Sequence, residues 1–278
     1  HQAVEAKEGL PITAEKLPLA QITRQRFFRM YDGLCGMTGT ATGSEAEFAT
    51  FYGLSVVPIP LRKPSQRRIL PARYFASDNA KWEAIAKAVR DCHERGQPVL
   101  VGTQTISSSE RLSNCLRKVG LEHQLLNGCQ SAEEAEIIAR AGEPGTVTIA
   151  TNMAGRGTDI KPSPESLAAG GLHVIVTERQ DSSRVDRQLV GRSARQGEPG
   201  SAQFFLSAED DLIDRHQPRL GRVMQKSADS QGEVFLAITS MVDRIQKRIE
   251  QAQYQQRRDL FRYDQYREGV LGQIHGSD

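Results

Sequence analysis

From about residue 56 to residue 206, short apolar runs alternate with amphipathic stretches, and this alternation constrains the fold more than any other feature. Uninterrupted apolar runs such as residues 98–102, 146–150 and 172–177 are typical of strands that are buried on both faces. The stretches between them carry apolar residues at helical spacing. Because strands separated by helices form parallel sheets covered on both sides, we predict an α/β fold with a parallel sheet flanked by helices.

The same pattern predicts the remaining elements. Further strands are expected over residues 56–59, 73–75, 123–126 and 202–206, and helices over residues 22–34, 79–95, 107–119, 131–139 and 183–195. Capping boxes at Ser107 and Ser131 are expected to begin two of these helices. Residues 218–232 are polar and are expected to be irregular, which makes them a plausible domain boundary.

A long C-terminal helix is predicted after that boundary. Its apolar residues form one stripe that needs a partner helix or a domain surface to cover it, and they are Ile238, Met241, Val242, Ile245, Ile249 and Ala252. Arg244, Lys247, Arg248, Arg257 and Arg258 lie on the same helix, where they either contact an anionic surface or form its solvated face.

Composition excludes several classes of protein. The 36 basic and 34 acidic residues nearly balance, so charge alone does not indicate a nucleic-acid partner. The four cysteines contain no close pair, which argues against a disulfide framework or a zinc site and favours buried free thiols. No apolar run is long enough to cross a bilayer and no signal peptide is recognisable, so we expect a soluble chain. Because its first residue is His1, we expect it to be a piece of a longer protein.

Residues 151–159 read Thr-Asn-Met-Ala-Gly-Arg-Gly-Thr-Asp and directly follow a predicted strand. Ligands of open parallel sheets bind at the carboxyl ends of the strands, so Arg156, Gly157 and Asp159 are expected to present polar groups there. Asp159 would accept hydrogen bonds from ribose hydroxyls or hold an arginine in place. Taken alone, the run is equally consistent with a loop-capping Asp beside a turn glycine.

Residues 188–197 read Gln-Leu-Val-Gly-Arg-Ser-Ala-Arg-Gln-Gly. On one helix, Arg192 and Arg195 would project from the same side and reach one anion together, with Gly191 leaving room for its approach. The planar fork of an arginine bonds two oxygens, which suits a transferring phosphoryl group. Two solvated arginines are the commoner meaning of such spacing, but the flanking Gln188 and glycines favour an anion-binding role.

A third segment, residues 36–41, is too rich in glycine and threonine for a helix interior and is expected to form a tight, hydroxyl-lined loop. Thr38 and Thr40 would relay the state of a nucleotide or simply satisfy loop amides. The sequence contains no Gly-x-x-x-x-Gly-Lys-Ser/Thr, so the half-site that would hold the phosphates and the metal is not in it.

In chain order, these runs and several others resemble the SecA preprotein translocase family. The matching residues are 1–9, 36–41, 96–102, 148–160, 170–175, 177–179, 188–197 and 205–211. The resemblance implies that ATP sits between two RecA-like lobes, and that hydrolysis drives unfolded secretory polypeptides through a membrane channel.

The resemblance also implies a domain order. Residues 1–20 would end the preprotein-crosslinking insertion, residues 21–55 would end the first RecA-like lobe, and residues 56–215 would form the second. Residues 216–278 would then be a linker and the start of the helical scaffold.

The roles of the site residues follow from the same resemblance. Arg192 and Arg195 would be the catalytic arginines of the sixth helicase motif. Asp159 would contact the nucleotide, and Arg156 and Gly157 would line the same cleft. Four further residues would couple the two lobes to each other, namely Thr38, Gly39, Thr40 and Gln188.

The resemblance implies ATP and Mg²⁺ as cofactors, both bound mainly by the first lobe, and no metal ligand in this chain. The partners would be a SecYEG-like membrane channel, an unfolded preprotein and an anionic membrane surface, without nucleic acid. The protein would be cytoplasmic and peripheral at the inner face of the plasma membrane. By itself the chain would be inactive, because the phosphate loop, metal and general base would lie on the absent lobe.

Two departures stand inside the arginine motif, where the family usually has Arg-Gly-Arg-x-Gly-Arg. This chain has Val190 and Ala194 in place of the first arginine and the second glycine. Ala194 adds a methyl group at a position where the family usually has glycine, which has no side chain.

Two alternative functions remain open at this point. Superfamily 2 helicases share similar glycine and arginine motifs, so the lobe could act on nucleic acid, although the weak net charge and the lack of an aromatic and basic strip oppose this. A non-catalytic remnant could instead bind a partner through the apolar stripe of the last helix.

Overall fold

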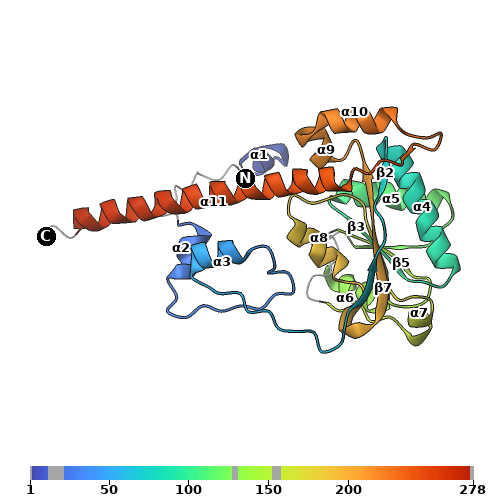
Figure 1. Ribbon diagram of the computed structural model, residues 1–278, viewed down its shortest axis with the longest axis horizontal. Helices are drawn as coiled ribbons and strands as arrows, with labels where there is room; N and C mark the ends of the chain where they lie inside the picture. Colours follow the sequence, from blue (N-terminus) through green and yellow to red (C-terminus); the bar gives the residue numbers. More distant parts are fainter. Residues whose placement is uncertain (1, 12–21, 127–130, 152–157, 276–278) are drawn as a thin grey trace. The chain divides into compact units, whose positions relative to one another are not determined.

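The computed structural model describes residues 2–11, 22–126, 131–151 and 158–275 (Figure 1). The chain divides into two compact units, one formed by residues 1–36, 46–55 and 256–278, and the other by residues 37–45 and 56–255. Each unit is described by itself.

The larger unit is built on a sheet whose strands follow the order β4-β5-β3-β6-β7-β2-β8, with β1 also pairing with β7. These strands are β1 (Gln66–Ile69), β2 (Arg73–Phe75), β3 (Val99–Thr103), β4 (Gln124–Leu126), β5 (Val147–Thr151), β6 (His173–Val176), β7 (Pro199–Ser207) and β8 (Glu233–Val234). The pairings are parallel except that of β2 with β8. This confirms the predicted parallel-sheet α/β class.

Helices cover both faces of this sheet (Figure 1). They are α4 (Asp78–Glu94), α5 (Ile106–Lys118), α6 (Ser131–Arg140), α7 (Pro164–Ala168), α8 (Ser183–Val190), α9 (Asp211–His216), α10 (Pro218–Lys226) and the first part of α11 (Thr239–His275). Side chains alternate along each strand, so Phe204 packs on one core while Phe205 packs on the other. The core under α4 and α5 includes Trp82 and Leu112, both buried.

The apolar stripe of α11 belongs to the opposite core. Ile238, Val242, Ile245 and Ile249 are buried there together with residues of α8 and α10, whereas Met241 is 42% exposed and Ala252 is also exposed. The sheet unit itself therefore covers the apolar stripe of α11. This removes the basis for the non-catalytic binding module, which needed the stripe to be available to a partner.

The smaller unit contains α1 (Gln2–Lys7), α2 (Arg24–Arg29), α3 (Glu45–Tyr52) and the end of α11. The predicted helix over residues 22–34 is shorter than expected, because Thr23 caps its start by accepting a hydrogen bond from the Arg26 amide and the helix ends before Met30. The side chains predicted to form its apolar face are largely exposed, with Phe27 at 44% and Met30 at 71%. Within this unit, α3 packs on α11 through Phe51 and Phe261, whose ring centroids are 5.5 Å apart.

Several predicted elements are wrong. Residues 56–59 form no strand, and the first strand is instead β1, which pairs with β7 and carries no apolar alternation. The expected irregular segment 218–232 begins with α10, which has Pro218 at its first position, where the missing N–H costs no helical bond. The cap of α5 is Thr105 rather than Ser107. Of the cysteines, Cys92 is buried but Cys35 is exposed, and Cys129 lies outside the described residues.

No helix in the described ranges combines the length and apolarity needed to span a membrane.

Candidate functional site

The two arginines of the second motif do not share an α-helix, contrary to prediction, because Arg192 lies on the turn after α8 and Arg195 begins a short 3-10 turn (Arg195–Gly197). Helix α8 ends at Val190, and Gly191 closes it by donating its amide to the Arg187 carbonyl at 2.8 Å. Ala194 and Gln196 then adopt left-handed backbone angles, with φ of 51° and 55°. Because that conformation ends a right-handed helix, Arg192 and Arg195 are presented by the turn that leads into β7.

The position of the turn follows from its neighbours on the sheet. The Ser193 hydroxyl donates to the Leu172 carbonyl at 2.8 Å, just before β6. A Cβ atom on Gly200 of β7 would lie 2.3 Å from the Ser193 Oγ and 2.8 Å from the Ala194 amide nitrogen. Glycine at position 200 therefore lets the turn rest directly against the start of β7.

This location differs from the expected one. Helix α8 starts after the carboxyl end of β6 and returns to the amino end of β7, so its last turn lies at the amino ends of the strands. The site was expected at the carboxyl ends, because residues 151–159 follow a strand there. Arg156 and Gly157 fall outside the described residues.

Asp159 and Arg195 are brought together. Arg195 donates from its Nη1 to the Asp159 Oδ1 at 2.7 Å and from its Nε to the Gly191 carbonyl at 3.3 Å. Both side chains remain about one-third exposed, at 38% for Arg195 and 34% for Asp159. Of the two roles expected for Asp159, the geometry shows the one in which it holds an arginine in place.

The predicted coupling residues also lie together. The Gln188 amide donates to the Thr40 hydroxyl at 3.3 Å, and the hydroxyls of Thr38 and Thr40 are 3.2 Å apart. The Thr40 amide donates to the Thr38 hydroxyl, so these threonines also satisfy loop amides. Nearby, Arg187 donates to the Thr42 carbonyl at 2.6 Å, which fixes the loop to α8 a second time.

A segment that sequence reasoning missed completes the site. Residues 61–67, which lead into β1, contribute Arg62, Lys63 and Arg67 to the same pocket. Their cluster of basic residues beside Pro64 was visible in the sequence, but a polar run without apolar alternation gives no sign of a strand. Burial lowers the pKa of Arg67, and the positive charge of the nearby Arg195 lowers it further.

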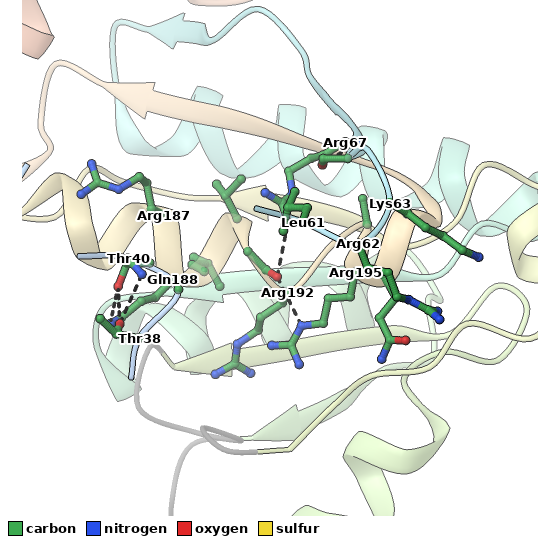
Figure 2. A pocket seen from close by; sticks show the side chains of 18 of the residues that line it. Thr38, Thr40, Leu61, Arg62, Lys63, Arg67, Arg187, Gln188, Arg192 and Arg195 are labelled. Atoms are coloured by element: carbon green, nitrogen blue, oxygen red, sulfur yellow. Dashed lines mark hydrogen bonds between the residues drawn. The ribbon is translucent and has the colours of Figure 1, made fainter. Parts of the chain in front are cut away.

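Together these segments enclose a pocket of about 910 Å³ (Figure 2). Its lining includes six basic side chains, namely Arg62, Lys63, Arg67, Arg187, Arg192 and Arg195. Among the described residues that line it, none is Asp or Glu. Figure 2 shows Arg192 and Arg195 extending side by side from the turn, with Thr38, Thr40 and Gln188 grouped nearby.

Such a lining suits a polyanion. The volume lies within the range of pockets that bind small molecules, and guanidinium groups pair readily with phosphate oxygens. Fold and pocket together define the class: an α/β protein with a mostly parallel sheet and a basic pocket at one side.

Comparison with known proteins gives the family. The SecA P-loop domain family matches residues 64–167 and 161–232, and the SecA DEAD-like domain family matches residues 1–49. The chain therefore belongs to the SecA family.

Individual relatives agree. The chain is 48% identical to "Protein translocase subunit SecA" of Desulfovibrio desulfuricans over 267 residues, which are 95% of this chain and 31% of that protein. It is 46% identical to the protein of the same name from Solidesulfovibrio magneticus, over 100% of this chain and 34% of the relative. The chain thus spans about a third of the length of the curated relatives it matches.

Among solved structures, the E. coli DEAD-box protein SrmB aligns at 23% identity with a TM-score of 0.43, over 55% of this chain and 82% of that chain.

Proposed function

We propose that this chain supplies the second lobe of the ATP cleft in a SecA-type motor, which moves unfolded preproteins through the membrane secretion channel. One observation carries the proposal: the pocket gathers six basic side chains, and no Asp or Glu is found among its described lining residues. Six basic side chains gathered around one pocket favour an anionic ligand, and Asp159 beside it pairs with Arg195. Membership of the SecA P-loop domain family supports a nucleotide as that ligand.

In this proposal Arg192 and Arg195 compensate the charge of the polyphosphate. Bound ATP would supply a phosphoryl group whose oxygens carry spread negative charge during transfer, and arginines supplied by a neighbouring lobe stabilise that charge. Asp159 holds Arg195 through its Oδ1, which pre-orients the guanidinium before the nucleotide arrives.

Coupling between the lobes is assigned to Thr38, Gly39, Thr40 and Gln188. The support is the hydrogen bond from Gln188 on α8 to Thr40 on the loop of residues 37–45, which belongs to the sheet unit but is separated from the rest of it in the chain by residues 46–55. A displacement of α8 would be transmitted to that loop through this contact. Arg156 and Gly157 are proposed to line the same pocket.

Other parts of the reaction are assigned to protein outside this sequence. The phosphate loop, the Mg²⁺ site and the general base would come from the first lobe, which leaves this chain inactive by itself. A SecYEG-like channel, an unfolded preprotein and an anionic membrane surface would be its partners. The complete motor would work in the cytoplasm, peripheral at the inner face of the plasma membrane.

A nucleic-acid substrate is less well supported. The formal net charge of +2 does not indicate a nucleic-acid partner, and the basic residues of the site gather around one pocket.

The proposal is tested by a full-length SecA protein that carries this segment. Arg195→Ala is expected to leave ATP binding measurable but to slow hydrolysis at least about a hundredfold, since charge stabilisation is lost mainly in the transition state. Arg248→Ala on the exposed side of α11 is the matched control and should hydrolyse ATP normally. Unchanged hydrolysis by the Arg195 variant, or steady turnover by the isolated chain, would contradict the proposal.

A further inference from the structure

Arg67 lies beside the arginine-bearing turn because of the register between β1 and β7. In that register Arg67 is opposite Gly200, the glycine that lets the turn rest against β7. Its neighbours along the strand, Gln66 and Arg68, are exposed, whereas Arg67 itself is partly buried.

The guanidinium of Arg67 bonds to main-chain carbonyls of the turn. Its Nε and Nη2 donate to the Ser193 carbonyl at 3.0 and 2.6 Å, and its Nη2 also reaches the Gly191 carbonyl at 3.5 Å. The Gly191 carbonyl is the same group that accepts from the Arg195 Nε (Figure 2). Arg67 and Arg195 are thus joined through one acceptor.

These carbonyls need a donor from outside the helix. Gly191 and Ser193 follow Val190, the last residue of α8, and the left-handed Ala194 turns the chain away before another helical turn can form. A planar guanidinium satisfies two such groups at once, which a lysine ammonium cannot do with the same geometry. Its positive charge also suits the negative end of the dipole of α8.

Arg67 is a third cation beside Arg192 and Arg195, so its role could be to attract an anion or to hold the turn. A residue kept only to attract an anion would aim its guanidinium into the pocket, but the described bonds of Arg67 go to the protein backbone. We propose that Arg67 is a positioning residue. It fixes the conformation of the turn, so that the side chains of Arg192 and Arg195 are held where both can contact one anion. This inference rests on the proposed function for the identity of the anion as a polyphosphate.

The first test uses the chain without ligand and compares Arg67→Lys and Arg67→Gln with the parent. Side-chain Nε–H signals of Arg195 and Arg192 are followed by NMR, with thermal melting as a check on folding. We expect the Arg195 signal to shift and broaden in both variants, because the turn that supplies its acceptor relaxes. Arg68→Lys and Arg68→Gln, on the exposed side of the same strand, should leave it unchanged. An unmoved Arg195 signal in Arg67→Lys would overturn the inference.

The second test titrates inorganic tripolyphosphate into the same proteins. Positioning predicts that Arg67→Lys, which keeps the charge, loses at least about fivefold in affinity and resembles Arg67→Gln. Simple attraction of the anion predicts instead that Arg67→Lys binds within twofold of the parent, and that result would overturn the inference. If the parent itself does not bind tripolyphosphate, the proposed function fails, while the ligand-free test still decides the role of Arg67.

A third measurement needs no substitution, so it applies even if both Arg67 variants fail to fold. In the parent saturated with tripolyphosphate, the signals of Arg192 and Arg195 should shift while the Arg67 Nε–H stays in place, still bonded to the Ser193 carbonyl. An Arg67 signal that shifts as far as that of Arg195 would identify it as a direct ligand of the anion and overturn the inference.

Discussion

At the carboxyl ends of β2 and β7, Lys81 is buried between Asp210 and Asp78, whereas at the amino end of β7 the arginines of the pocket line an open cavity without a carboxylate among its described lining residues. Burial opposes the charge of Lys81, yet Asp210 and Asp78 outweigh it and raise the pKa of the ammonium. At the first end a buried cation is matched by neighbouring carboxylates, whereas at the other end six basic side chains line one pocket beside the partly exposed Asp159, which pairs with Arg195. We expect the first arrangement to serve stability and the second to serve the proposed binding of an anion.

The largest expected effect is the loss of stability when Lys81 is removed from between Asp210 and Asp78. Lys81→Met should lower the free energy of unfolding by about 3–5 kcal/mol, because the carboxylate of Asp210 is left buried without its counter-ion. Denaturant unfolding measures this loss. Arg111→Ala is the control, since the Arg111 side chain is 48% exposed and 3.4 Å from Asp78, and it should cost less than about 1 kcal/mol. A loss below 1 kcal/mol for Lys81→Met would contradict the comparison.

The second effect concerns pH at the same end. Burial raises the pKa of Glu178 from 4.5 to about 7, and the negative charge of Asp210 adds to the increase. A carboxyl whose pKa is raised by folding binds its proton more tightly in the folded state. The protonated Glu178 therefore adds to the free energy of unfolding below pH about 4.5, and this stabilisation is lost as the pH rises through about 7. This difference corresponds to roughly 3 kcal/mol.

Glu178→Gln isolates that contribution, because an amide does not titrate. The difference in unfolding free energy between variant and parent should change between pH about 4.5 and 7, with the parent losing stability relative to the variant as the pH rises. A difference that stays constant over this window would show that Glu178 does not titrate in it.

The smallest effect concerns the pocket end. Ala194 holds a left-handed conformation that costs an alanine about 1–2 kcal/mol, so Ala194→Gly should stabilise the chain by roughly 0.5–1 kcal/mol after the greater flexibility of unfolded glycine is subtracted. Ala88→Gly inside α4 should destabilise it by about 1 kcal/mol. Equal destabilisation by both substitutions would argue against the strained turn.

The buried strands of the sheet could be predicted from the sequence. The runs that became β3, β5 and β6 are apolar on both faces, which leaves few alternatives to a central parallel strand. The arginines and Asp159 could also be selected as site residues, because their motifs combine glycine with charge. Their contacts with one another could not be derived from spacing.

The rest depended on tertiary contacts. The end of α8 cannot be predicted from the sequence, because alanine rarely adopts the left-handed conformation of Ala194 and Gly191 gives no sign that it ends the helix instead of leaving room for a ligand. Strand β1 was missed because its pairing with β7, and not its own composition, makes it a strand. Arg67 acts on carbonyls 124 and 126 residues away, and no local pattern encodes such a contact.

Calorimetric titration of ATP into the chain tests the central claim most directly, namely that the basic pocket is a polyphosphate site. The parent is expected to bind ATP more tightly than adenosine, and Arg192→Gln combined with Arg195→Gln should weaken ATP binding at least tenfold, which is about 1.4 kcal/mol, without a comparable loss of stability. Equal affinity for ATP and adenosine, or an unchanged ATP affinity in the double variant, would contradict the account.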